Sequence, residues 1–266
     1  MADKIVTENL TPLVVPAPLD DDARTRIAAL AVRQTKANGV LMKAITFVGG
    51  QVEDGLKVLP KPVRNQLNDV TRQALRRSYD LAALSRSGFG KRFGSDQAHR
   101  VIGTMSGAIG GFGGLPTALA ELPVATTLIF RAVLHVAAQY GEDPESDVTR
   151  MECLAVFGSG GPGPKDDGVD TAFIGARISL SGAAVNTLIS RIAPKFAAVL
   201  SQKLAAQTVP VLGAVAGAGT NYAFVNYYVA LAHVHFGLRQ LARDHGDAAV
   251  LDEFHRVLLA SRLPQT

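Results

Sequence analysis

The sequence predicts an all-α protein: a single multi-helix globular domain with two glycine-rich central helices. No stretch shows the alternation, or the density of Val, Ile, Thr and aromatic residues, that strands require. Several segments instead repeat apolar residues at helical spacing, and two long runs, 101–120 and 204–232, contain no charged residue. We therefore expect an extended arm over residues 1–19 and one helical domain over residues 20–266.

The first two helices are predicted from their end signals. Aspartates at 20–22 begin a helix, because carboxylates suit the free amide groups of a first turn. The pair Asn38-Gly39 predicts a break in this helix. A second helix then covers about 40–58 and ends before Pro60.

Residues 62–86 form the clearest amphipathic helix, with arginines on the face opposite the apolar one. The residues expected to face inward are Val63, Leu67, Val70, Ala74, Leu75 and Leu81.

Further helices are predicted near 145–157, near 168–191 and over 247–261. Pro194 is expected to begin another helix, because proline suits a first turn. Pro210 is expected to kink or divide the next one.

Glycines recur every four residues in both uncharged runs: Gly103, Gly107 and Gly111 in the first, and Gly213 and Gly217 in the second. This spacing places small residues on one helix face, where another backbone can approach closely. Each glycine costs about 1 kcal/mol relative to alanine, so close packing must compensate. Two interpretations remain open: a densely packed protein core, or a glycine zipper entering a bilayer. The hydropathy of both runs is marginal for a span, which favours a peripheral protein.

The composition excludes several protein classes. With 47% hydrophobic and 19% charged residues, the chain is not intrinsically disordered. Its one cysteine, Cys153, excludes a disulfide framework, and its apolar neighbours predict a small core residue. The N-terminal residues lack the pattern of a secretory signal. We expect a cytoplasmic protein, peripheral at the inner face of the membrane.

Basic residues gather between Lys57 and Arg100, where ten cations accompany three anions. Aromatic residues are not interleaved among them as a single-strand nucleic-acid platform requires, and no DNA- or RNA-binding motif is present. We therefore expect no nucleic-acid partner. A solvated helix face and attraction to anionic lipid both remain open.

Common catalytic and cofactor motifs are missing. The run GSGGPGPK at 158–165 has the wrong spacing for a phosphate loop, and its prolines remove amide donors. No GxSxG or HExxH motif occurs. His233 and His235 point about 200° apart on a helix, so they do not form a ligand pair. One buried, hydrogen-bonded histidine and one exposed histidine are expected, with no metal site and no assigned cofactor.

Isolated charges inside apolar segments give a candidate polar site. An unpaired buried charge costs several kcal/mol, so these groups must reach water or one another. Arg131 and His135 are one turn apart, where a carboxylate such as Glu121 or Glu152 could meet them. A structural salt-bridge network and a binding or catalytic site both remain open. The full candidate set is Glu121, Arg131, His135, Glu152, Arg177 and His235.

The same region resembles the EcsC family of bacterial proteins. The resemblance is carried by residues 110–144, by MECLAVFGSGG at 151–161 and by the glycine-rich segment 209–236, and it extends over about 60–245. The residues that match the central pattern are Glu121, Pro123, Arg131, Tyr140, Gly141, Asp143 and Pro144.

The family takes its name from a gene beside an ABC transporter. The resemblance therefore implies a helical, membrane-associated protein linked to transport or secretion, with a membrane transporter as a partner, and it supplies no catalytic residues. Our first hypothesis is a non-enzymatic protein that associates with lipid or membrane. The alternative is a metal-dependent or acid–base hydrolase built on Glu121, Glu152 and His135, which requires these side chains to converge.

Overall fold

A computed structural model of the chain describes residues 16–49, 61–84, 114–159, 182–206 and 213–262. Helices account for nearly all of these residues, and none of them lies in a strand. The predicted all-α fold class is confirmed.

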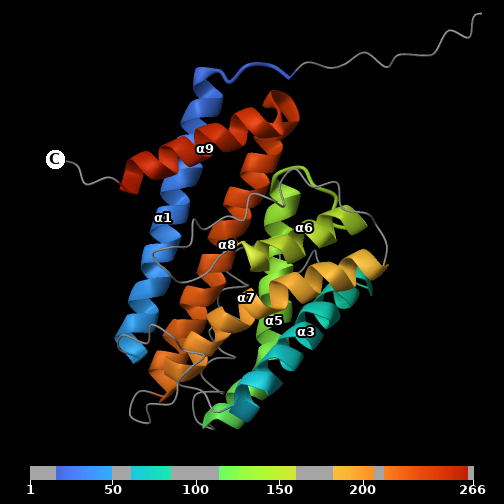
Figure 1. Ribbon diagram of the computed structural model, residues 1–266, viewed down its shortest axis with the longest axis vertical. Helices are drawn as coiled ribbons and strands as arrows, with labels where there is room; N and C mark the ends of the chain where they lie inside the picture. The colour runs from blue at the N-terminus through green and yellow to red at the C-terminus, as the bar shows by residue number, and fades with distance from the viewer. Residues whose placement is uncertain (1–15, 50–60, 85–113, 160–181, 207–212, 263–266) are drawn as a thin grey trace, which may run out of the picture.

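The long helix α8 is central to the described part of the bundle (Figure 1). Helix α1 packs along one side of α8, and α5 along another. Helix α3 packs on α5 and α7, the short helix α6 contacts α5, α7 and α8, and α9 crosses α1 and α8. The bounds are α1 (Asp21–Gly49), α3 (Lys61–Leu84), α5 (Gly114–Gln139), α6 (Asp147–Gly158), α7 (Gly182–Ala206), α8 (Gly213–His245) and α9 (Asp247–Arg262).

The larger core cluster is centred on Phe157 of α6. Its ring centroid lies 6.2 Å from that of Phe130 on α5, 4.9 Å from that of Phe196 on α7 and 5.1 Å from that of Tyr228 on α8. Such aromatic pairs contribute about 0.5–1.5 kcal/mol beyond their area burial. One side chain of the shortest helix therefore joins three other helices.

A smaller core cluster joins the first helix to the last two. Ile27 and Leu30 of α1 pack with Val234 and Leu238 of α8 and with Phe254 of α9. The chain before α1 reaches the same corner. There the amide of Ala17, which lies in the non-helical residues 16–20, donates to the carbonyl oxygen of Asp244 in α8 at 3.2 Å.

Three predicted helices are confirmed with shifts of one or two residues at their ends: 62–86 as α3, 145–157 as α6 and 247–261 as α9. Of the inward residues predicted on α3, five are buried or half-buried: Val63, Leu67, Val70, Ala74 and Leu75.

The prediction that Leu81 faces inward is wrong, because its side chain is 42% exposed. The buried stripe of α3 advances through Leu67, Thr71, Leu75 and Ser78, and Ala82 packs against the core one turn later. These steps of three or four residues average slightly more than the 3.6 residues of a helical turn, so the stripe drifts away from Leu81.

Two predicted helix ends are also wrong. Helix α1 continues through Asn38-Gly39, since the cost of one glycine is about 1 kcal/mol and the packing of α1 along α8 offsets it. Pro194 lies inside α7 and does not begin a helix. Its ring is on the exposed face, while Ile192 and Phe196 on either side are buried and hold the helix together across it.

The glycine-packing prediction is not tested by the described residues. Gly103, Gly107 and Gly111 lie outside them, as does Pro210. Gly213 and Gly217 are in the first turns of α8, where the side-chain environment is not described.

Two described helices are long and apolar enough to cross a membrane by length and composition. They are Leu119–Gln139 in α5, with mean hydropathy 1.5, and Gly182–Ser201 in α7, with mean hydropathy 1.2. About half of each window is buried in the protein, and its large apolar side chains contribute to the main core cluster. The packing of these side chains in the core is therefore sufficient to explain why α5 and α7 are so apolar.

Replacing each of two glycines by alanine should change the stability of the protein in opposite directions. At Gly39, a mid-helix position, an added Cβ meets nothing within 4 Å, so Gly39→Ala should stabilise the protein by about 0.5–1 kcal/mol. Gly246 has φ +83°, and an added Cβ would lie 3.0 Å from Pro16 Cγ, so Gly246→Ala should destabilise it by about 1–2 kcal/mol. Urea unfolding of both variants tests this, and shifts of the same sign would contradict the assignment.

Candidate functional site

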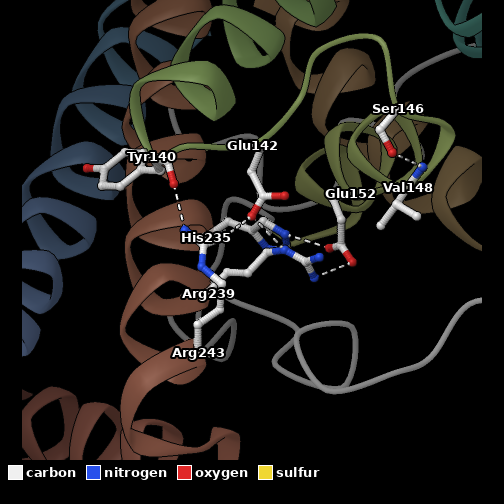
Figure 2. A network of polar contacts seen from close by, with 8 residues as sticks. All are labelled: Tyr140, Glu142, Ser146, Val148, Glu152, His235, Arg239 and Arg243. Atoms are coloured by element: carbon white, nitrogen blue, oxygen red, sulfur yellow. Dashed lines mark hydrogen bonds and ion pairs between the residues drawn. The ribbon is translucent and has the colours of Figure 1, made fainter.

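The candidate site begins with Glu152 on α6. This helix starts at the N-cap Ser146, whose Oγ accepts a hydrogen bond from the Val148 amide at 3.2 Å (Figure 2). Every residue from 149 to 158 is buried, so α6 is enclosed by other helices. Glu152 is thereby carried into the interior, with its side chain only 3% exposed.

Two side chains of α8 satisfy the Glu152 carboxylate. His235 Nε2 lies 2.8 Å from Oε2, and Arg239 Nη1 donates to Oε1 at 2.9 Å. His235 is 1% exposed and Arg239 is 25% exposed. Both oxygens of a buried carboxylate are thus paired, which is the condition under which a buried charge is tolerated.

The network continues from Arg239 to the surface through the loop between α5 and α6. Arg239 Nε donates to Glu142 Oε1 at 2.9 Å, and Arg243 Nη1 donates to the same oxygen at 2.6 Å. Arg243 Nη2 also donates to the Tyr140 carbonyl oxygen at 2.7 Å (Figure 2). The network alternates two carboxylates with two guanidinium groups, so their formal charges balance.

The surroundings of the two ring nitrogens of His235 indicate its tautomer. Because Nε2 faces a carboxylate oxygen, we assign the proton to Nε2, which then donates to Glu152. Nδ1 is buried and has no hydrogen-bond partner among the described residues. An unprotonated Nδ1 leaves one acceptor unsatisfied, whereas a protonated one would leave a buried donor unsatisfied on a charged ring.

His233 lies on another side of α8 from His235. Its Nδ1 is 3.1 Å from the Tyr140 hydroxyl oxygen, and the two rings meet edge to face with centroids 5.7 Å apart. Burial raises the pKa of Tyr140. The predicted buried, hydrogen-bonded histidine is confirmed as His235, but the prediction that the other is exposed is wrong, because His233 is half-buried.

A second charged residue of α6, Arg150, is also buried. Its guanidinium pairs with Asp147, donates to the Glu145 carbonyl oxygen at 3.0 Å and lies 5.3 Å from the ring centroid of Tyr79 on α3. Burial is the main cause that raises the pKa of Tyr79, and Asp147 adds to it. Arg150 therefore holds the start of α6 against α3.

The structure brings together only part of the predicted polar site. The predicted pairing of Glu152 with Arg131 or His135 is wrong, because its two oxygens bond His235 and Arg239. Glu121 and His135 are both half-buried on α5, and 14 residues of helix separate them by about 21 Å along the axis.

Two predicted residues remain, Arg131 and Arg177. Arg131 is half-buried on α5, and Arg177 lies outside the described residues. The hydrolase hypothesis required Glu121, Glu152 and His135 to converge, and the separation of Glu121 from His135 opposes this. In the described part of the chain, no three His, Cys, Asp or Glu side chains are grouped to hold a metal ion.

Sequence analysis missed three members of the network: Glu142, Arg239 and Arg243. A signal was present, because His235, Arg239 and Arg243 recur every four residues and so share one face of α8. Their partners lie about 80 to 100 residues earlier in the chain, and helical spacing cannot supply that pairing.

A second candidate site is the basic surface of α3 and α7, which pack against each other. Helix α3 contains five basic and two acidic residues, and α7 contains three basic residues and no acidic one. Arg72 and Arg77 on α3 and Arg191 on α7 form no ion pair or hydrogen bond with side chains in the described residues. Unlike the arginines of the buried network, these guanidinium groups are not paired with any carboxylate of the described residues.

Comparison with models of known protein families identifies the family of this chain. The model of the EcsC protein family matches residues 33–241, which include Glu142, Glu152, His235 and Arg239. The chain belongs to the EcsC protein family. The resemblance identified in the sequence is confirmed, and the EcsC match begins earlier than residue 60, within α1. The comparisons with curated proteins and with solved structures gave no significant match.

Removing the charge of Glu152 should strongly destabilise the protein. In Glu152→Gln an NH2 group replaces one of the two carboxylate oxygens, so it cannot accept the hydrogen bond from His235 or Arg239 at that position. Breaking a buried ion pair costs about 3–5 kcal/mol. Arg256→Gln on α9 is the control, because its pair with Glu253 is at the surface and should cost less than about 1 kcal/mol. Equal, small losses in urea unfolding would show that the network contributes little.

Cys153 should report on opening of α6. Burial raises the pKa of this thiol well above its usual value, and the charges of Glu152 and Glu142 raise it further. At pH 8 the native thiol should react with Ellman's reagent more than about a thousandfold slower than the urea-unfolded chain, because reaction requires opening of the core. Similar rates in the two states would contradict the enclosure of α6.

Proposed function

We propose that this EcsC family protein is a non-enzymatic helical protein that associates with membranes rich in anionic lipid through the exposed basic residues of α3 and α7. The observation that carries the proposal is the absence of partners for Arg72, Arg77 and Arg191 within the described residues. An arginine already paired inside the protein would have to break that pair to bind a headgroup, whereas these three would not.

The energy of such an association follows from the charges of the two helices. Each Lys or Arg near an anionic membrane surface contributes about 1 kcal/mol, and the attraction decays within a Debye length of about 10 Å at 0.1 M salt. Helices α3 and α7 together carry eight basic and two acidic residues. A few of these cations at the surface would therefore suffice for reversible, salt-sensitive binding.

A peripheral position agrees with the burial of the apolar helices. The exposed side chains along α7 include Asn186, Ser190, Arg191 and Lys195, while its large apolar residues contribute to the core. The family's association with an ABC transporter gene supports a role beside a membrane transporter, at the inner face of the membrane. The saturated Glu152 carboxylate gives no comparable support to a hydrolase.

Vesicle co-sedimentation tests the proposal. The protein should bind vesicles of phosphatidylcholine with phosphatidylglycerol, bind pure phosphatidylcholine weakly, and dissociate as salt is raised. The double variant Arg72→Gln/Arg77→Gln should bind about thirtyfold more weakly, since two arginines contribute about 2 kcal/mol.

The matched control is Arg24→Gln/Arg33→Gln, which removes two exposed arginines from α1. Figure 1 shows α1 and α3 on opposite flanks of the bundle. The control should retain wild-type binding. An equal loss in both double variants would contradict a surface specific to α3 and α7, and failure of the wild-type protein to bind either vesicle would refute the proposal.

A further inference from the structure

An open groove of about 420 Å³ lies between α3 and α7. This volume falls within the range of about 300–1,000 Å³ typical of ligand sites. None of the residues that line the groove is acidic: they are Arg72, Gln73, Arg76, Arg77, Asn186, Ile189 and Ser190.

One arginine of the groove is held in place. Arg76 Nε donates to Asp80 Oδ2 at 3.0 Å, and Arg76 Nη1 donates to Asn186 Oδ1 at 2.9 Å. The second bond joins α3 to α7, so Arg76 fixes the two walls of the groove relative to each other. Asp80 partly offsets its charge.

The other two arginines are available for a ligand. Arg72 and Arg77 have no ion pair or hydrogen bond to a side chain within the described residues. Arg72 and Arg76 are four residues apart on α3, where like charges destabilise a helix. An anion in the groove would remove this repulsion.

We infer that the groove binds a phosphate group, and specifically a phosphomonoester, with Arg72 and Arg77 as its main ligands. Guanidinium groups donate two parallel hydrogen bonds to phosphate oxygens, and a phosphomonoester carries about −1.5 to −2 charges at pH 7. Gln73 and Ser190 add a side-chain amide and a hydroxyl as neutral donors. Ile189 and the arginine methylenes give an apolar wall for the carbon skeleton next to the phosphate.

A lipid headgroup and a soluble phosphorylated compound share this chemistry. The inference that the phosphate group belongs to a lipid rests on the proposed membrane function, whereas the inference that the groove binds a phosphate group does not. The experiment therefore has a soluble arm and a vesicle arm.

The soluble arm titrates the full-length protein with glycerol 3-phosphate, against glycerol with sodium chloride at the same ionic strength. Calorimetry and the arginine side-chain NMR signals should show saturable binding of glycerol 3-phosphate only. Arg77→Gln should weaken binding about tenfold or more, because it removes charge-assisted hydrogen bonds. Arg33→Gln is its control, because Arg33 is exposed on α1, equally without an ion pair or hydrogen bond to a side chain of the described residues, and outside the groove lining.

A variant that leaves the net charge unchanged distinguishes binding in the groove from nonspecific attraction to the positive charge of the protein. Ser190→Trp fills the groove without altering net charge and should abolish glycerol 3-phosphate binding. Thr187→Trp places the same side chain on an exposed position of α7 outside the lining, and it should bind like the wild type. Thermal unfolding checks that both variants fold.

The vesicle arm compares phosphatidic acid, a phosphomonoester, with phosphatidylglycerol, a phosphodiester, at equal surface charge. Tighter binding to phosphatidic acid, lost in Ser190→Trp and kept in Thr187→Trp, would support a lipid source. Saturable glycerol 3-phosphate binding without vesicle binding would support the groove and refute the membrane proposal. Vesicle binding with no lipid preference, no effect of Ser190→Trp and no glycerol 3-phosphate binding would overturn the inference and leave the membrane proposal standing.

Discussion

The buried carboxylate of Glu152 is the constraint on which much of the described fold depends. It lies on a helix of 12 residues that is enclosed from residue 149 to its end, so water cannot compensate its charge. Pairing by His235 and Arg239 therefore fixes the face of α8 that must meet α6. The Phe157 ring cluster, one and a half turns further along α6, fills the apolar space beside this pairing.

The network also explains the role of the loop before α6. Glu142 accepts hydrogen bonds from Arg239 and Arg243, so a loop carboxylate is held by two arginines of α8. Gly141, with φ +80°, allows the chain to turn between α5 and this carboxylate. The Tyr-Gly-x-Asp-Pro pattern at 140–144 therefore has a structural meaning: it delivers Glu142 to the helix that also binds Glu152.

The sequence predicted the fold class, three helices closely and two members of the network, because periodicity and isolated charges are local signals. It could not predict the partners of Glu152, since His235 lies 83 residues away and packing decides which helix faces meet. Local breaker signals were misleading at Gly39 and Pro194. Packing of α1 along α8 offsets the cost of Gly39, and burial of Ile192 and Phe196 offsets that of Pro194. Leu81 was misplaced because the buried stripe of α3 advances by slightly more than one turn per step.

The described arginines fall into two environments: some are paired with carboxylates, and others lie on the surface of α3 and α7. Arg239, Arg243 and Arg150 are all paired with carboxylates, and in the buried network the charges cancel. This charge-balanced network stabilises helix contacts, and both oxygens of Glu152 are already bonded to side chains of α8. Arg72 and Arg77 differ, since no carboxylate of the described residues pairs with them and a groove lies beside them. Within the described part of the chain, these two arginines are therefore the groups that we propose for recognition of an anion.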